Sequence, residues 1–156
     1  MINIKKLILL IPCTLLFAGC KVTYSFSGAS ISPEVKTVSI PRFPNNALLV
    51  APILSSTLTE ALQDRFSRQT RLTLVPEGGD LNFEGGNEYA VRNNLTITVR
   101  VRFTNTIDPS QNYDKTFSAF APYNSDQLLQ NAEPTLIPEI VEQLVEDIFN
   151  AAVSQW

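Results

Sequence analysis

The sequence predicts an α+β fold: a two-layer sandwich in which a mixed or antiparallel sheet of four to five strands carries two helices on one face. Three observations support this class. A ten-residue segment alternates apolar and polar side chains without exception, two longer segments show the helical period, and turn-forming residues separate the elements. The chain has 156 residues, which is enough for one domain.

The first two elements are predicted to be a strand and a helix. Residues 35–43 are rich in β-branched side chains, and Val38 and Ile40 share one face. In residues 53–66, one face of a helix collects the side chains that recur at helical spacing: Leu54, Leu58, Ala61, Leu62, Arg65 and Phe66. The other side collects the polar ones: Ser55, Ser56, Thr59, Gln63 and Asp64. We expect this second side to face solvent.

The next segments are short. Residues 70–75 alternate, with Leu72 and Leu74 on one face, and this pattern predicts a second strand. Residues 81–84 are a short alternating piece. The glycine pair at its end predicts that residues 85–87 turn the chain again.

The clearest strand covers residues 95–104. Five apolar side chains line one face: Leu95, Ile97, Val99, Val101 and Phe103. Thr and Arg side chains line the other face, which is left to water or to a partner. A loop at residues 108–112 and the alternating residues 113–121 predict an antiparallel neighbour for this strand.

The last element is predicted to be a helix over residues 135–153. Thr135 is the expected N-cap, and Pro138 is tolerable in the first turn. Apolar side chains again form one face: Ile137, Ile140, Val141, Leu144, Val145, Ile148, Phe149 and Ala152. Both helices are therefore expected to pack on the apolar side of the sheet.

The first twenty residues have the pattern of an export signal. Lys5 and Lys6 precede an apolar run of about 11 residues, short of the ~20 that a membrane-spanning helix needs. The four residues that follow, Phe17, Ala18, Gly19 and Cys20, resemble the bacterial lipobox, the signal-peptidase motif whose cysteine receives a diacylglycerol and becomes the new N-terminus. An ordinary secretory signal cut near Ala18, with a free thiol on Cys20, is the alternative.

The lipobox predicts the organisation of the chain. We expect a signal peptide over residues 1–19, a lipidated tether over residues 20–33 and a single α+β domain over residues 34–156. Two or three acyl chains on Cys20 would anchor the protein stably, so nothing else needs to span the bilayer. Tyr24 and Phe26 lie at strand spacing, and the tether could instead pack as an edge segment of the domain.

Composition excludes several classes of function. The chain has no histidine and only two cysteines, Cys13 and Cys20, so it lacks the residues of a Ser-His-Asp triad, an HExxH metal helix or a CxxC redox motif. Its net charge of −3 and isoelectric point of about 4.9 argue against a nucleic-acid partner. We therefore predict no catalytic residues, no metal site, no enzyme activity, and no cofactor apart from the acyl chains.

Arginines are the candidate binding residues. Arg65, Arg68 and Arg71 cluster at the end of the first helix, while Arg100 and Arg102 project from one strand face. They are either ordinary surface charges or a patch that contacts phosphate or a partner, because guanidinium groups bind phosphate in bidentate fashion. The sequence leaves both interpretations open.

Ordered segments along most of the chain are similar to those of LptE-type lipopolysaccharide-assembly lipoproteins of the Bacteroidota kind. They are residues 24–30, 35–40, 43–46, 58–66, 70–72, 79–81, 95–99 and 146–150. The resemblance implies a lipoprotein on the periplasmic side of the outer membrane, with Lys21 after the lipobox cysteine in keeping with outer-membrane sorting. It also implies that the protein binds and plugs an LptD-like β-barrel and assists the transport of lipopolysaccharide to the cell surface. Lipopolysaccharide itself is then a second candidate partner.

The alternative function is a lipid-anchored periplasmic adaptor that regulates a cell-wall synthase or another envelope complex. One departure from the family pattern concerns the sheet. Relatives have a further strand-like stretch where this chain has only the segment from Gly86 to Asn93. We therefore expect a four-stranded core sheet with an exposed edge near residues 81–84 or at the strand over residues 95–104.

Overall fold

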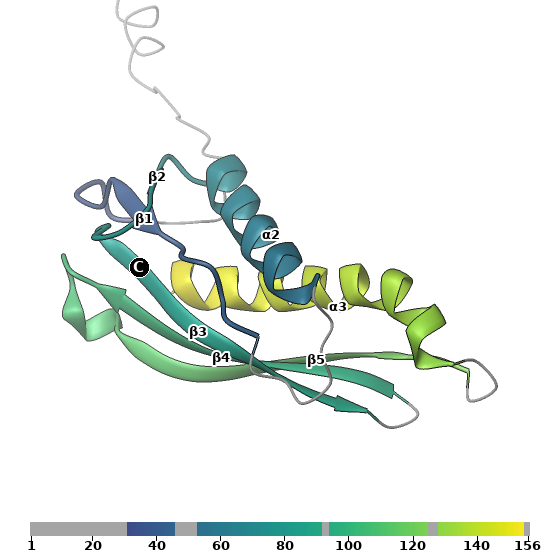
Figure 1. The fold of residues 1–156 in the computed structure, drawn as a ribbon. Helices are drawn as coiled ribbons and strands as arrows, with labels where there is room; N and C mark the ends of the chain where they lie inside the picture. Colours follow the sequence, from purple (N-terminus) through teal and green to yellow (C-terminus); the bar gives the residue numbers. More distant parts are fainter. Residues whose placement is uncertain (1–30, 46–52, 92–93, 125–127, 155–156) are drawn as a thin grey trace, which may run out of the picture.

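The computed structural model describes residues 31–45, 53–91, 94–124 and 128–154. In chain order the elements are β1 (Thr37–Ser39), α2 (Leu54–Gln69), β2 (Thr73–Val75), β3 (Leu81–Val91), β4 (Asn94–Asn105), the 3-10 turn η1 (Pro109–Gln111), β5 (Tyr113–Pro122) and α3 (Leu129–Val153). Both helices lie on one face of the sheet (Figure 1). The predicted two-layer α+β class is confirmed.

Within the described residues, five strands form a mixed sheet in the order β2-β1-β3-β4-β5. β1 runs parallel to both β2 and β3, and α2 makes the crossover from β1 to β2. β3, β4 and β5 pair antiparallel. Short loops suffice for these antiparallel pairs, whereas the parallel pair needs the helical crossover.

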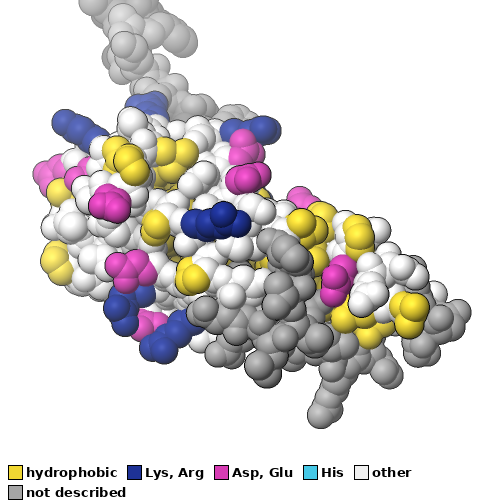
Figure 2. Space-filling model, viewed as in Figure 1, with side chains coloured by type: hydrophobic (Ala, Val, Ile, Leu, Met, Phe, Trp, Pro, Cys, Tyr) yellow, Lys and Arg dark blue, Asp and Glu magenta, His cyan; other side chains and the backbone are white. Residues whose placement is uncertain are grey.

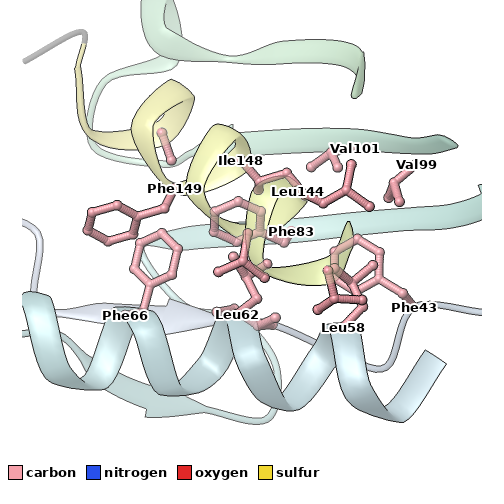
Figure 3. Packing of buried hydrophobic residues seen from close by; sticks show 14 of the residues in the cluster. Phe43, Leu58, Leu62, Phe66, Phe83, Val99, Val101, Leu144, Ile148 and Phe149 are labelled. Carbon is pink, nitrogen blue, oxygen red and sulfur yellow. The ribbon is translucent and has the colours of Figure 1, made fainter. Parts of the chain in front are cut away.

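One hydrophobic core lies between the sheet and the two helices (Figure 3). At its centre the ring of Phe66 on α2 packs edge to face against Phe83 on β3, with 5.3 Å between centroids, and against Phe149 on α3, with 5.0 Å. Leu62 and Leu144 extend this layer along the two helices. The apolar faces predicted for both helices therefore meet the same core.

The strand predicted over residues 95–104 is β4, and its alternation is confirmed. All five of its apolar side chains are buried, from Leu95 at 0% exposure to Phe103 at 1%. The predicted loop contains η1, and the predicted antiparallel neighbour is β5. Periodicity was a reliable guide here because one face of β4 packs against the helices and the other is uncovered.

The prediction of a turn at residues 85–87 is wrong, because β3 continues through the glycine pair to Val91. A Cβ atom on Gly85 would lie 2.3 Å from the backbone oxygen of Arg100 and 2.7 Å from Cε1 of Phe43. The glycine therefore serves a close approach of the Phe43 ring and the neighbouring strand. A glycine inside a strand and a glycine in a turn look alike in sequence.

The predicted exposed edge is also wrong. β3 pairs with β4 over its whole length and with β1 at its start, and β4 lies between β3 and β5. Most of the segment from Gly86 to Asn93 forms the second half of β3, so the missing family strand leaves no gap in the described sheet. The strands with a free edge are β2 and β5.

Ser55 and Thr59, predicted to face solvent, are buried instead. The hydroxyl of Ser55 donates to the backbone oxygen of Phe43. The Thr59 hydroxyl accepts the Phe43 N–H over 3.2 Å and donates to the Ser55 oxygen over 2.7 Å. The chain that leaves β1 runs beside α2, so these hydroxyls satisfy backbone groups that would otherwise be unpaired.

Several element boundaries differ from the predictions. β1 and β2 are only three residues each, and Leu74 is 38% exposed while Leu72 is buried. α3 begins at Leu129, so Thr135 is not its N-cap, and Pro134 and Pro138 both lie inside the helix. Each proline removes one helical hydrogen bond and so disfavours the helix. Burial of Ala132 in the early turns favours it. Tertiary burial outweighs the proline signal in this segment.

Candidate functional site

The helices leave one face of the β3–β5 hairpins uncovered, on the lower side of Figure 1. We call this surface the open sheet face. Most of its described side chains are polar, and the large apolar side chain of Phe120 on it is 57% exposed. Its principal residues are Glu84 on β3, Thr96, Thr98, Arg100, Arg102 and Thr104 on β4, and Asp114, Thr116, Ser118 and Phe120 on β5.

Two arginines and two carboxylates form an ion-pair network on this face. Arg100 binds Asp114 in bidentate fashion, with Nε 2.8 Å from Oδ1 and Nη2 3.0 Å from Oδ2. Strand register places Arg102 opposite both Asp114 and Glu84. Its Nη2 lies 3.6 Å from Asp114 Oδ2 and its Nη1 3.8 Å from Glu84 Oε2. Each guanidinium thus has a carboxylate neighbour.

The network balances the charge of the open sheet face. The hydrogen bond and positive charge of Arg100, with a smaller contribution from Arg102, hold the pKa of Asp114 below its ordinary value. Asp114 therefore stays ionised at neutral pH. Figure 2 shows blue and magenta side chains interleaved along the lower left of the molecule. The face is a mixed-charge surface, which is a different thing from a basic patch.

The open sheet face has only shallow depressions among its described residues. A depression of about 250 Å³ lies between Glu84, Arg102 and Asp114, and a second of about 350 Å³ lies beside it at Thr98 and Thr116. The hydroxyls of Thr98 and Ser118 are 3.1 Å apart across the strands. Such a surface offers hydrogen bonds and paired charges to a flat polar partner.

Of the other three predicted arginines, Arg65 and Arg68 lie on α2, in the helix layer. Arg68 pairs with Asp64 one turn away at 2.7 Å, and the Arg65 guanidinium lies 5.9 Å from the Phe149 ring centroid. Arg71 is exposed just before β2. The structure thus does not bring the five arginines together, because Arg100 and Arg102 belong to the opposite face of the sheet.

The lipobox residues Phe17, Ala18, Gly19 and Cys20 lie outside the described residues, as does the aromatic pair Tyr24 and Phe26. In the ranges that the structure covers, no helix is long and apolar enough to cross a membrane. The same ranges contain no group of three or more acidic or cysteine side chains that could hold a metal ion.

Sequence reasoning missed the two acidic partners, Glu84 and Asp114. A usable signal existed, because the short loop between the two strands limits the register of β4 against β5. That register places Arg102 opposite Asp114. Glu84 could not be found in this way, because residues 81–84 were predicted as a short alternating segment followed by a turn, and no register with β4 followed from that.

Comparison with known proteins gives a family and a fold. A family model described as LptE, lipopolysaccharide-assembly, matches residues 35–152. No curated protein matches the sequence.

Solved structures share the fold at low identity. A protein from Xanthomonas campestris superposes with a TM-score of 0.57 at 11% identity, covering 81% of this chain and 91% of that one. A hypothetical protein from Chlamydia trachomatis gives 0.53 at 14% identity, covering 76% and 97%. A minor lipoprotein from Acinetobacter baumannii gives 0.51 at 12% identity, covering 78% and 94%.

Proposed function

The chain belongs to the LptE lipopolysaccharide-assembly family, and from that membership we propose that it is an outer-membrane lipoprotein that binds and plugs an LptD-type β-barrel. In this role it assists lipopolysaccharide transport and assembly at the cell surface without catalysing a reaction. The observation that carries the proposal is the family match over residues 35–152, which includes every described helix and strand almost to the end of α3.

We propose the attachment that the lipobox predicts. Residues 1–19 are removed, Cys20 carries the acyl chains, and residues 20–33 tether the domain to the periplasmic side of the outer membrane. Each buried methylene contributes about 0.8 kcal/mol, so two or three chains anchor a protein of this size stably. The acyl chains are the only cofactor in this proposal.

The open sheet face is the surface that we propose for the barrel. The lumen of an outer-membrane barrel is lined by polar side chains. A flat face that offers paired charges and hydroxyls fits such a wall, because its own carboxylates already satisfy Arg100 and Arg102 and little unpaired charge is buried on contact. The same carboxylates repel phosphate at this face.

Contact with lipopolysaccharide phosphates would then fall to the arginines in the helix layer. Arg65 and Arg68 line a groove of about 470 Å³ between α2 and α3. Arg71 is exposed and follows Arg68 by three residues. Asp64 and Glu142 share that groove, so its charge is also mixed. We propose these three arginines as the phosphate contacts of the chain.

Photo-crosslinking in the outer membrane tests the barrel contact. Cross-linking side chains at Thr98 and Ser118 should capture a β-barrel protein, whereas the same group at the exposed Glu142 and Glu146 of α3 should capture much less. Depletion of the protein should leave lipopolysaccharide on the periplasmic side. Capture of a penicillin-binding protein instead would favour the adaptor function and contradict the plug.

Labelling with palmitate tests the anchor separately. The full chain should incorporate the label and a Cys20→Ser variant should not. Incorporation that survives in the variant would place the lipid elsewhere, and absence of label in both would remove the anchor from the proposal.

A further inference from the structure

A groove of about 510 Å³ runs beside α2 at the β2 edge of the sheet. One wall is the side of α2 that carries Ser56, Thr59 and Gln63, and the opposite wall is the end of β2 with Pro76. Residues 40–42, which leave β1, lie between these two walls. A groove between a helix and a free strand edge has the geometry in which added peptide strands bind.

The backbone of Leu74 points to this free edge. The N–H of Thr73 donates to the backbone oxygen of Lys36 over 2.8 Å, so it points inward to β1. Backbone groups alternate sides along a strand, and the N–H and C=O of Leu74 therefore point outward. No described strand pairs with that side of β2.

The side chain of Leu74 faces the groove. Leu74 is the cross-strand neighbour of Val38, whose side chain lies fully in the core, so both project toward the helix layer. Beyond the cover of α2, Leu74 stays 38% exposed. Leu74 thus combines an exposed large apolar side chain with backbone groups that no described strand pairs, on an edge strand that is short and is followed by Pro76.

The chain itself supplies a segment that fits this edge. In residues 21–30 the apolar side chains of Val22, Tyr24 and Phe26 alternate with polar ones, as in a half-buried strand. Ile31, the first described residue, packs against the core at the entry to β1. Five extended residues span about 17 Å and β2 spans about 10 Å, so the segment before Ile31 is long enough to run along the whole of β2.

We propose that residues 21–30 add to the outer edge of β2 as a further strand, with Tyr24 and Phe26 seated in the groove beside α2. The direction is antiparallel to β2, because the chain enters β1 at its N-terminal end and β2 runs parallel to β1. The added strand pairs with the outward N–H and C=O of Leu74. It shields the exposed Leu74 side chain from water.

This strand addition sets the reach of the tether. Ten extended residues span up to about 35 Å, whereas a tether docked from Tyr24 onward leaves only residues 21–23 to bridge the distance to the membrane. The domain is then held close to the bilayer surface. This consequence rests on the proposed lipidation of Cys20, but the strand addition itself does not.

Hydrogen exchange on the full chain tests the pairing at one amide. The Leu74 N–H should exchange as slowly as the Thr73 N–H, although it lies on the outer edge. In the Tyr24→Ser/Phe26→Ser variant, Leu74 should exchange at least about fivefold faster, the factor for one hydrogen bond of about 1 kcal/mol. Thr73 should be unchanged, and Thr23→Ala/Ser25→Ala is the matched control. Fast exchange of Leu74 in the unmodified chain overturns the proposal.

Disulfide trapping gives an independent measurement. Leu74→Cys is combined in turn with Tyr24→Cys and Phe26→Cys, and with Thr23→Cys and Ser25→Cys as controls on the other side of the strand. A disulfide within one chain from position 24 or 26, and not from 23 or 25, supports the proposal. A disulfide between two copies would assign the edge to dimer formation, and no disulfide at either position would reject the docking; both overturn it.

Discussion

The two halves of the sheet are held together by different means. β3, β4 and β5 have 11, 12 and 10 residues and form continuous antiparallel ladders. β1 and β2 have three residues each and are joined through α2. The long half depends on its own backbone, whereas the short half needs side chains from elsewhere to hold it.

Asp80 contributes to that support through several hydrogen bonds. Its carboxylate accepts the N–H groups of Lys36 and Thr37 at 2.7 and 3.0 Å, and its own N–H donates to the Thr37 hydroxyl at 2.9 Å. Its backbone oxygen accepts the Thr106 N–H at 2.9 Å, just after β4. One residue therefore ties the start of β1 to the antiparallel half. The comparison indicates that the short parallel pair of β1 and β2 is stabilised by side-chain hydrogen bonds and by the core that it shares with the long half.

The largest effect is expected where both halves share the core. Phe66→Ala removes the ring that joins α2 to β3 and α3, and it should lower the free energy of unfolding by about 3–5 kcal/mol. Urea denaturation followed by circular dichroism measures this. The exposed Ser67→Ala is the control and should change stability by less than about 0.5 kcal/mol. Two separate transitions in the variant would show that the halves have independent cores.

A second variant tests the contact of the long half with the segment that leaves β1. Gly85→Ala places a methyl group against the Arg100 backbone oxygen and the Phe43 ring, and the overpacking should cost about 1–3 kcal/mol. In a Phe43→Leu background Gly85→Ala should cost less than in the unmodified chain, because the ring contact is relieved and the backbone contact remains. No cost in that background would mean that the Arg100 backbone is not in the way.

Asp80→Asn should weaken the short half specifically. We expect a loss of about 1–2 kcal/mol at neutral pH, since hydrogen bonds to a charged group are replaced by weaker ones. Backbone hydrogen bonds from Lys36 and Thr37 hold the pKa of Asp80 below its ordinary 3.8. The charged form thus contributes stability above pH 3.8, and that contribution is lost as pH falls through the folded-state pKa.

The pH series supplies the control for this variant. The stability difference between the two proteins should shrink toward the lowest pH, and amide exchange should accelerate in β1 and β2 while the middle of β4 is unchanged. An equal acceleration across β4 would contradict the division of the sheet into two halves.

The smallest effect is expected on the open sheet face. Arg100→Gln breaks the bidentate bond to Asp114, but both side chains meet solvent and the antiparallel ladder remains. The loss of stability should be smaller than for Asp80→Asn and should disappear at high salt. Because Arg100 lowers the pKa of Asp114, any contribution of the pair is also lost as pH falls through the folded-state pKa of Asp114. A loss that persists in high salt would mean that the ladder depends on this pair.

The predictable parts of the fold are the elements with one buried face. β4 was found because Leu95 to Phe103 alternate without interruption, and α2 because its apolar side chains keep the helical period. The second half of β3 was missed since the glycine pair imitates a turn. The start of α3 was missed since Pro134 is a stop signal that burial of the first turns outweighs.

The candidate site was predictable only in part. Arg100 and Arg102 lie two residues apart on a strand and share a face, as expected from alternation. Their partners could not be inferred in the same way, because Asp114 is 14 positions from Arg100 and Glu84 lies across a different strand pair. Of the two interpretations that the sequence left open for these arginines, the neighbouring carboxylates favour a balanced network over a basic patch.

Local pattern alone determined where most of the helices and strands lie and which side of most of them meets the core. Only the tertiary structure decided the strand order, the two free edges, the burial of Ser55 and Thr59, and the charge of the open sheet face. The reason is physical. Periodicity records whether a side chain meets the core or water, whereas cross-strand neighbours depend on segments that are distant in sequence and meet only when the chain is folded.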